Sequence, residues 1–186
     1  MYIISNIEAA ILGLVCEGPQ YGYKIEKIVE ERGMRNWTEI GFSSIYYVLK
    51  RLEDRGLIQS KLEKVEGKPP RKVYTITEEG IVAMEEKVKS LLSKNKKLIS
   101  PFDLGIAYLK LLEPEDVFEC LKRYIDSVDE HINFLENSIH MMEKSKAPYH
   151  VIALFSRPLA HMKTEKKWVE GFMDKINKEE KLKEVK

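Results

Sequence analysis

A strict heptad pattern in the second half of the chain is the feature that most constrains its fold. Eight apolar residues recur at alternating spacings of three and four: Phe118, Leu121, Ile125, Val128, Ile132, Leu135, Ile139 and Met142. This spacing places all eight on one stripe of an α-helix, as in a coiled coil. We call them the heptad stripe. One short helix cannot cover such a stripe, so the pattern predicts packing within the chain together with pairing to a second copy.

Further helices flank the heptad stripe. Ser100–Pro101 begins a predicted short helix over 102–112, and Pro114 begins the helix that carries the stripe. After 144–148, a last helix presents a second apolar stripe, in which only Lys166 breaks the spacing: Phe155, Leu159, Met162, Val169, Met173 and Ile176. The charged residues 178–186 are expected to fray. We therefore predict a C-terminal helical dimerisation domain over 101–186.

The first half of the chain has a different order of elements. Apolar spacing predicts helices over 6–16, 21–32 and 43–55, the first of them begun by a capping box of Ser5 and Glu8. Two β-compatible runs, 57–65 and 71–77, surround a polar turn, and Thr77 then begins a helix over 78–98. The chain is thus expected to be mainly α with a small β-hairpin, with a winged helix-turn-helix domain over 1–98.

Composition excludes several classes of protein. The chain has 31 Lys and Arg against 30 Asp and Glu, a net charge of +1, so nucleic-acid binding must rest on local charge. Two distant cysteines predict no disulfide scaffold and fit a reducing cytoplasm. No apolar run reaches the ~20 residues of a membrane span, so no membrane partner is expected. No catalytic motif, cofactor motif or metal-ligand spacing occurs, which predicts a protein that is not an enzyme and holds no metal.

The predicted helix 43–55 has two distinct faces. Its apolar residues share one arc, whereas the opposite arc is polar and holds Ser43, Tyr47, Lys50 and Asp54, flanked by Tyr46 and Arg51. Hydroxyl groups can bond base edges and phosphates in the major groove, and the two cations can neutralise phosphate charge. An ordinary solvated helix face fits the same residues.

The predicted hairpin adds local positive charge. Residues 61–72 hold two glutamates against five cations, namely Lys61, Lys64, Lys68, Arg71 and Lys72. Two prolines stiffen its tip, and a rigid basic loop beside a recognition helix can grip phosphate or enter the minor groove. A solvated turn is the alternative, but the helix and the hairpin together are more specific than either alone.

Three segments in register resemble one family. The chain resembles the PadR family of transcriptional regulators over about residues 1–85. The segments that carry the resemblance are ILGLVCEGPQYGY (11–23), SSIYYVLKRLEDRGLI (43–58) and GKPPRKVYTITEEG (67–80). The resemblance implies a dimeric winged-helix protein, usually a repressor, whose C-terminal helices dimerise. It implies DNA contacts from Ser43, Ser44, Tyr46, Tyr47, Lys50, Lys68, Arg71 and Lys72. It also places Tyr23 and Lys24 near the phosphate backbone.

The sequence therefore favours a homodimeric, sequence-specific DNA-binding repressor controlled by a small, aromatic effector. An effector pocket is predicted near four aromatic side chains, Phe102, Tyr108, Phe155 and Trp168, although these could equally fill the core. The alternative function is a winged-helix module that binds proteins through its coiled coil, without specific DNA binding. The near-neutral net charge favours that alternative, and the basic hairpin argues against it.

Overall fold

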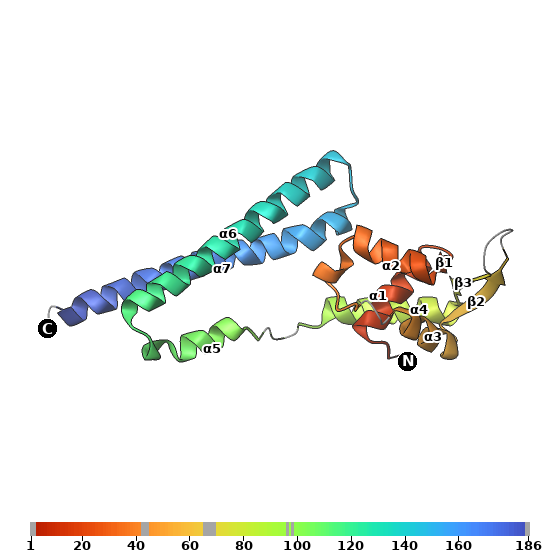
Figure 1. Ribbon diagram of the computed structural model, residues 1–186, viewed down its shortest axis with the longest axis horizontal. Helices are drawn as coiled ribbons and strands as arrows, with labels where there is room; N and C mark the ends of the chain where they lie inside the picture. The colour runs from red at the N-terminus through yellow and green to blue at the C-terminus, as the bar shows by residue number, and fades with distance from the viewer. Residues whose placement is uncertain (1–2, 42–44, 65–69, 96, 98, 185–186) are drawn as a thin grey trace. The chain divides into compact units, whose positions relative to one another are not determined.

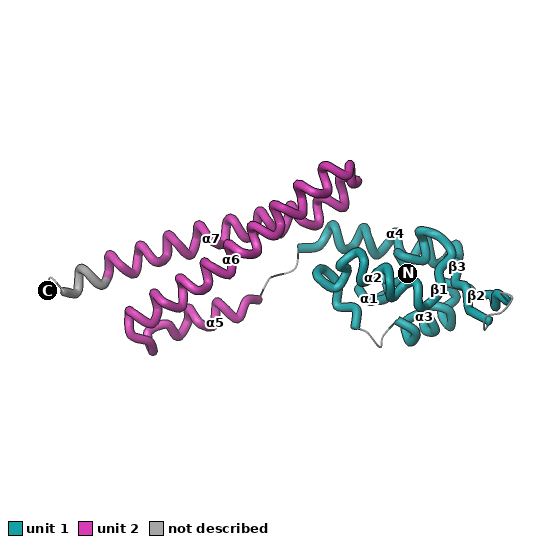
Figure 2. The backbone as a smooth tube through the Cα atoms, turned by 45° about the horizontal axis from the view of Figure 1, so that its top comes forward, with its two compact units in different colours: residues 1–97 teal, residues 98–186 magenta. Residues whose placement is uncertain are grey.

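The computed structural model of the chain describes residues 3–41, 45–64, 70–95, 97 and 99–184. The chain forms two compact units, Met1–Lys97 and Leu98–Lys186 (Figure 2). Long helices dominate, and the strands form a small antiparallel sheet in the first unit (Figure 1). The predicted fold class, mainly α with a small β-hairpin, is confirmed.

The first unit has the element order of a winged helix. Its helices are α1 (Asn6–Cys16), α2 (Gly22–Glu31), the 3-10 helix η1 (Met34–Asn36), α3 (Ile45–Asp54) and α4 (Glu78–Ser93). Its strands are β1 (Gln20–Tyr21), β2 (Ile58–Glu63) and β3 (Arg71–Ile76), in the order β1-β3-β2. The β2–β3 ladder runs from the Ile58–Ile76 pair to the Glu63–Arg71 pair. Strand β1 was not predicted, because two residues carry no periodic pattern.

Side-chain caps and glycines set the helix ends in this unit. The Ser5 hydroxyl accepts from the Glu8 backbone N–H at 3.1 Å, and the Glu8 carboxylate accepts from the Ser5 N–H at 2.7 Å. This is the predicted capping box, which satisfies two backbone donors at the start of α1. Gly33 and Gly56 follow α2 and α3 with φ of 57° and 70°, a left-handed conformation that favours glycine at helix ends.

The core of the first unit fixes which side of α3 faces outward. The inner residues of α3 are buried with the fully buried α1 residues Ile11, Leu12 and Val15. These inner residues are the four that the sequence predicted: Ile45, Val48, Leu49 and Leu52. Because this side of α3 is buried, the opposite side of the helix is exposed to solvent. The start of α4 packs closely against the backbone at Leu57. A Cβ on Gly80 would lie 2.0 Å from the Leu57 carbonyl oxygen, so this contact requires glycine.

The second unit is a helical hairpin with a short helix at its side. Its elements are α5 (Pro101–Ala107), the 3-10 helix η2 (Leu109–Leu111), α6 (Pro114–Lys144) and α7 (Tyr149–Glu184). Helices α6 and α7 pack along each other, joined by a short turn (Figure 1). The predicted helix over 102–112 is broken at Tyr108. The expected fraying from residue 178 is wrong, because α7 continues to Glu184 through Lys and Glu residues that favour helix.

The heptad stripe packs mainly against α7 of its own chain. Leu121, Val128 and Ile132 are buried, and the other stripe residues are partly buried. Val169 of α7 is fully buried and packs with Leu121. Lys166, which interrupts the second stripe, lies 2.7 and 2.6 Å from the two carboxylate oxygens of Asp129 on α6. An ion pair between the two helices thus replaces an apolar contact. No helix among the described residues is long and apolar enough to cross a membrane.

Candidate nucleic-acid interface

The outer face of α3 presents aromatic hydroxyl groups to solvent. Tyr46 is 58% exposed and Tyr47 is 65% exposed, which is far more than tyrosines retain in a core. Lys50, one turn further along, is exposed and has no partner among the described residues. Ser43 and Ser44, predicted to start this face, lie outside the residues that the structure describes. The described part of the face therefore offers two phenol groups and one ammonium group.

Glycine at the start of α2 positions one of these tyrosines. A Cβ on Gly22 would lie 2.5 Å from Cε1 of Tyr46, so only a glycine allows the ring to rest against this helix. Gly22 thus leaves the space that the Tyr46 ring occupies beside α2. The sequence did not show that Gly22 lies against the Tyr46 ring, because the two residues are distant in the chain.

The root of the β2–β3 hairpin, which we call the wing root, holds Arg71 in a network of aromatic and acidic groups. The Arg71 guanidinium lies 3.9 Å from the centre of the Tyr21 ring, and its Nε donates to Glu63 at 2.8 Å. Its Nη1 also donates to the Tyr23 hydroxyl at 3.3 Å, and the Tyr21 hydroxyl donates to Glu63 at 2.8 Å. The start of α2 and the wing root are therefore joined. The network brings together Tyr23 and Arg71, two of the predicted site residues.

A second ion pair connects the wing root to α3. Lys72 Nζ lies 2.8 Å from Glu53 Oε2, and the Ser60 hydroxyl donates to the other Glu53 oxygen. The hydrogen bonds from Lys72 and Ser60 lower the pKa of Glu53, and those from Tyr21 and Arg71 lower the pKa of Glu63. Both carboxylates are ionised at neutral pH. Sequence reasoning did not pair either carboxylate with a cation, because both pairs are formed only in the folded chain.

Arg51 is tied to the first helix rather than left free. Glu8 is only 2% exposed, and its Oε1 lies 3.2 Å from Arg51 Nε and 3.0 Å from Arg55 Nη1. Burial alone would raise the pKa of Glu8, but the Ser5 hydrogen bonds and the two arginines bring that pKa below its ordinary value. The charged carboxylate thus anchors the C-terminal half of α3 to α1. Arg51 was predicted as a DNA contact, and its pairing with Glu8 gives it a structural role.

The remaining predicted cations differ in their surroundings. Lys24 is exposed at the start of α2 and has no partner within the described ranges. Lys68 lies outside the residues that the structure describes. We define the polar face as the described residues of α3, the start of α2 and the wing root that carry these groups: Tyr23, Lys24, Tyr46, Tyr47, Lys50, Arg71 and Lys72. All of them belong to the first unit.

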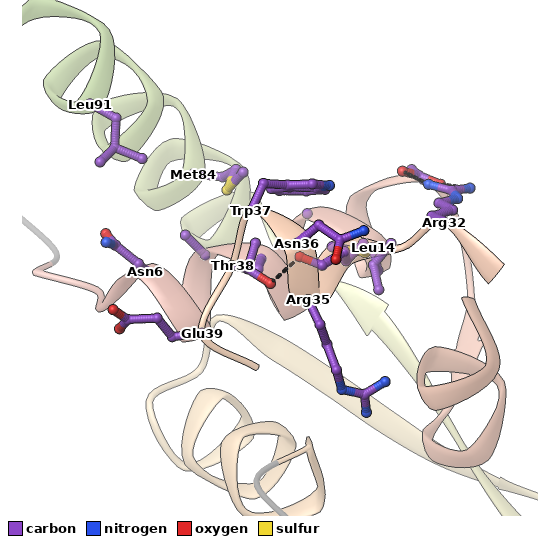
Figure 3. Close-up of a pocket in the computed structure, with 15 residues that line it drawn as sticks. Asn6, Leu14, Arg32, Arg35, Asn36, Trp37, Thr38, Glu39, Met84 and Leu91 are labelled. Carbon is purple, nitrogen blue, oxygen red and sulfur yellow. Dashed lines mark hydrogen bonds and ion pairs between the residues drawn. The ribbon is translucent and has the colours of Figure 1, made fainter. Parts of the chain in front are cut away.

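A large open hollow lies elsewhere in the first unit. Its volume is about 800 Å³, and it is lined by α1, the η1 region and two α4 residues (Figure 3). The Trp37 ring, 47% exposed, lies beside Met84 and forms one wall (Figure 3). The opposite side of α1 carries Glu8, which contacts α3. The same helix therefore borders the hollow and anchors α3.

The predicted effector pocket is only partly assembled within the second unit. Phe102 and Trp168 line one hollow of about 440 Å³, together with Asp103, Ile106 and Glu165. Tyr108 and Phe155 do not line it; Tyr108 is exposed and Phe155 is partly buried. Among the described residues, no three His, Cys, Asp or Glu side chains gather as metal ligands.

Three comparisons link the chain to known proteins. Residues 11–86 match the family model of the Transcriptional regulator PadR-like family. The chain is 23% identical over 181 residues to the Negative transcriptional regulator PadR of Bacillus subtilis (strain 168), covering 93% of this chain and 98% of the relative. It resembles the crystal structure of B. subtilis PadR in complex with operator DNA, with a TM-score of 0.73 and 21% sequence identity. The match covers 94% of this chain and 99% of the chain in that structure. The crystal structure of B. subtilis PadR in complex with p-coumaric acid gives a TM-score of 0.74 at 21% sequence identity. That match covers 92% of this chain and 95% of the chain in that structure.

Proposed function

The chain belongs to the PadR-like family of DNA-binding transcriptional regulators, and we propose that it is a homodimeric repressor whose polar face binds operator DNA. The observation that carries this proposal is the grouping of exposed Tyr46, Tyr47 and Lys50 with the wing-root cations in one unit. A similar fold in a complex of B. subtilis PadR with operator DNA supports it.

In the proposed complex, α3 enters the major groove. Its tyrosine hydroxyls and Lys50 contact base edges, and Ser43 and Ser44, which precede α3 in the sequence, add further hydroxyl groups. Arg71, Lys72 and Lys68 of the hairpin contact phosphates or the minor groove, and Tyr23 and Lys24 contact the adjacent backbone. Base contacts then provide sequence preference, and phosphate contacts fix the position of the protein.

Dimerisation is proposed for the second unit. Large apolar side chains remain exposed there, among them Leu111 at 81%, Met141 at 71% and Tyr149 at 85%. A second copy would remove this surface from water, because the chain's own helices do not cover it. A dimer would also present two α3 helices to successive major grooves, ~34 Å apart.

Repression and its release by an effector are supported by relatives. The B. subtilis relative is named a negative regulator, and one of its structures contains p-coumaric acid. We propose that a small aromatic effector lowers DNA affinity here too, from the hollow lined by Phe102 and Trp168. The hollow beside Trp37 is the second candidate site, because α1 connects it to α3 through Glu8.

A direct experiment tests the DNA-binding proposal. A gel-shift titration with the promoter region of the protein's own gene should give a discrete complex that survives an excess of random competitor DNA. A shift that random DNA abolishes equally would contradict sequence-specific binding. Absence of any DNA complex would instead favour the protein-interaction module, which a pull-down through the second unit would then examine.

Fluorescence separates the two effector sites. Trp37→Phe and Trp168→Phe each leave one tryptophan as a reporter of its own unit. A compound that releases operator DNA and changes only the signal of Trp168 places the effector at Phe102 and Trp168. A change in Trp37 alone would move the site to the hollow in the first unit.

A further inference from the structure

Most of the cationic side chains on and beside the polar face form ion pairs with carboxylates. Arg71 pairs with Glu63 at 2.8 Å, and Lys72 pairs with Glu53 at 2.8 Å. At the edge of the face, Arg51 pairs with Glu8. Of the five described cations that the sequence assigned to DNA, only Lys24 and Lys50 have no carboxylate partner among the described residues. The face therefore carries much less net positive charge than its count of cations implies.

The two exposed pairs differ from the buried one. Glu8 is almost completely buried and belongs to the capping box of α1, so its pairs are part of the fold. The side chains of Glu63 and Arg71 are 45% and 33% exposed, and those of Glu53 and Lys72 are 26% and 48% exposed. Exposed ion pairs are weak, because water screens both charges. A phosphate can therefore replace either of these two carboxylates.

Both carboxylates also lie where DNA is proposed to bind. At 100° per residue, Glu53 lies only about 20° around α3 from Tyr46 and about 60° from Lys50. Glu63 is directly opposite Arg71 in the β2–β3 ladder. Each anion would thus remain close to the DNA after losing its partner, and its repulsion from phosphate would oppose binding to any sequence.

We propose that Glu53 and Glu63 are affinity-limiting residues of the polar face: they occupy Lys72 and Arg71 in the free protein and hold down its sequence-independent affinity for DNA. This inference rests on the proposed function, since it assumes that the polar face meets DNA. The two ion pairs lower the net positive charge of the hairpin, and that charge sets its general attraction to nucleic acid.

The two carboxylates should reduce the salt dependence of DNA binding. Each phosphate that a protein neutralises contributes about 0.9 to the slope of log affinity against log salt. A cation whose carboxylate stays beside the DNA neutralises little net charge. Removing one carboxylate should therefore steepen the slope by up to about 0.9 per subunit, or about 1.8 per dimer.

Three variants test this inference in the full-length chain. Glu53→Gln and Glu63→Gln keep an oxygen acceptor for Ser60 and Tyr21 but remove the charge. Glu85→Gln is the matched control, because Glu85 forms an exposed pair with Lys89 at 3.6 Å on α4, away from the polar face. Fluorescence anisotropy measures the affinity for a random duplex between 50 and 200 mM salt. A duplex selected from a random pool by the unmodified protein serves as the second probe.

Either Glu53→Gln or Glu63→Gln should bind the random duplex more tightly, and for a dimer the gain should be up to about tenfold larger at 50 mM than at 200 mM salt. Glu53→Asp and Glu63→Asp, which keep the charge, should behave like the unmodified protein. If both Gln variants match Glu85→Gln in affinity and slope, the inference is wrong, even though the protein binds DNA. If the unmodified protein binds neither duplex at 50 mM salt, the proposed function fails, and the inference fails with it.

Discussion

The two units of the chain bury their apolar residues in different ways. The first unit encloses a continuous core drawn from α1, α2, α3, the strands and α4. The second unit has a much smaller buried cluster around Val117, Leu121 and Val169, and most residues packed on it are only partly buried. Because burial of apolar surface is the main stabilising contribution, the first unit should be stable alone and the second should depend on a further partner.

The largest effect is expected from separating the units. A fragment of residues 1–97 should be a folded monomer, whereas the full-length chain should be a dimer at micromolar concentration, because the proposed dimer contacts belong to the second unit. Light scattering and circular dichroism measure both properties. A dimeric fragment, or a monomeric full-length protein, would break the comparison between the units.

A core substitution in the first unit should lower the stability of the protein by the same amount at every protein concentration. Leu49 is fully buried beneath the polar face, and Leu49→Ala should lower the free energy of unfolding by about 2–5 kcal/mol. Val169→Ala in the second unit should instead make the melting temperature more dependent on protein concentration, because dimerisation contributes to its stability. Thermal melts at two concentrations that gave the same shift for both variants would contradict this distinction.

The Glu8 anchor should give the first unit a pH-dependent component of stability. The pKa of Glu8 is lowered in the folded protein, so its ionised form stabilises the fold. This contribution is complete above the unfolded value of about 4.3 and is lost as the pH falls through the lower, folded value. Glu8→Gln should therefore cost about 1–3 kcal/mol at pH 7 and much less in strong acid. Denaturant melts across this range check the prediction, and a difference that grew on acidification would contradict it.

The smallest effects on stability are expected on the polar face, where substitutions should leave folding intact and change only DNA binding. Tyr47→Ala or Lys50→Ala should reduce discrimination between operator and random DNA by about 1–3 kcal/mol for each lost base contact. Arg71→Ala should instead weaken both duplexes alike. Anisotropy titrations separate the two patterns, and a loss of sequence preference only in Arg71→Ala would reverse the assigned roles.

The same contrast between the units explains what the sequence could predict. Periodic spacing identified the inner face of α3 and the heptad stripe, because each follows from residues close together in the chain. Strand β1 was missed, since its two residues are ordered only by pairing with β3. The contacts of Glu8 with Arg51 and of Gly22 with Tyr46 were missed as well, because they join residues that only the folded chain brings together.

The sequence predicted which residues form the candidate site, but not the ion pairs that join them to other residues. Tyr46, Tyr47, Lys50, Arg71 and Lys72 were identified from residue type and from the family resemblance. Their acidic partners Glu53 and Glu63 were not, because a carboxylate among cations has no distinctive pattern in a charge count. The aromatic residues of the predicted effector pocket are also assembled only in part, because helical spacing does not show which side chains from α5 and α7 meet.

Hydroxyl-radical footprinting of the full-length chain on its own promoter region tests the central claim most directly. If the first unit binds DNA and the second unit pairs two such units, footprinting should show two protected stretches related by symmetry. They should be separated by about one helical turn, 10 base pairs, and both should be lost in Tyr47→Ala. A single protected stretch, or protection that Tyr47→Ala leaves unchanged, would contradict it.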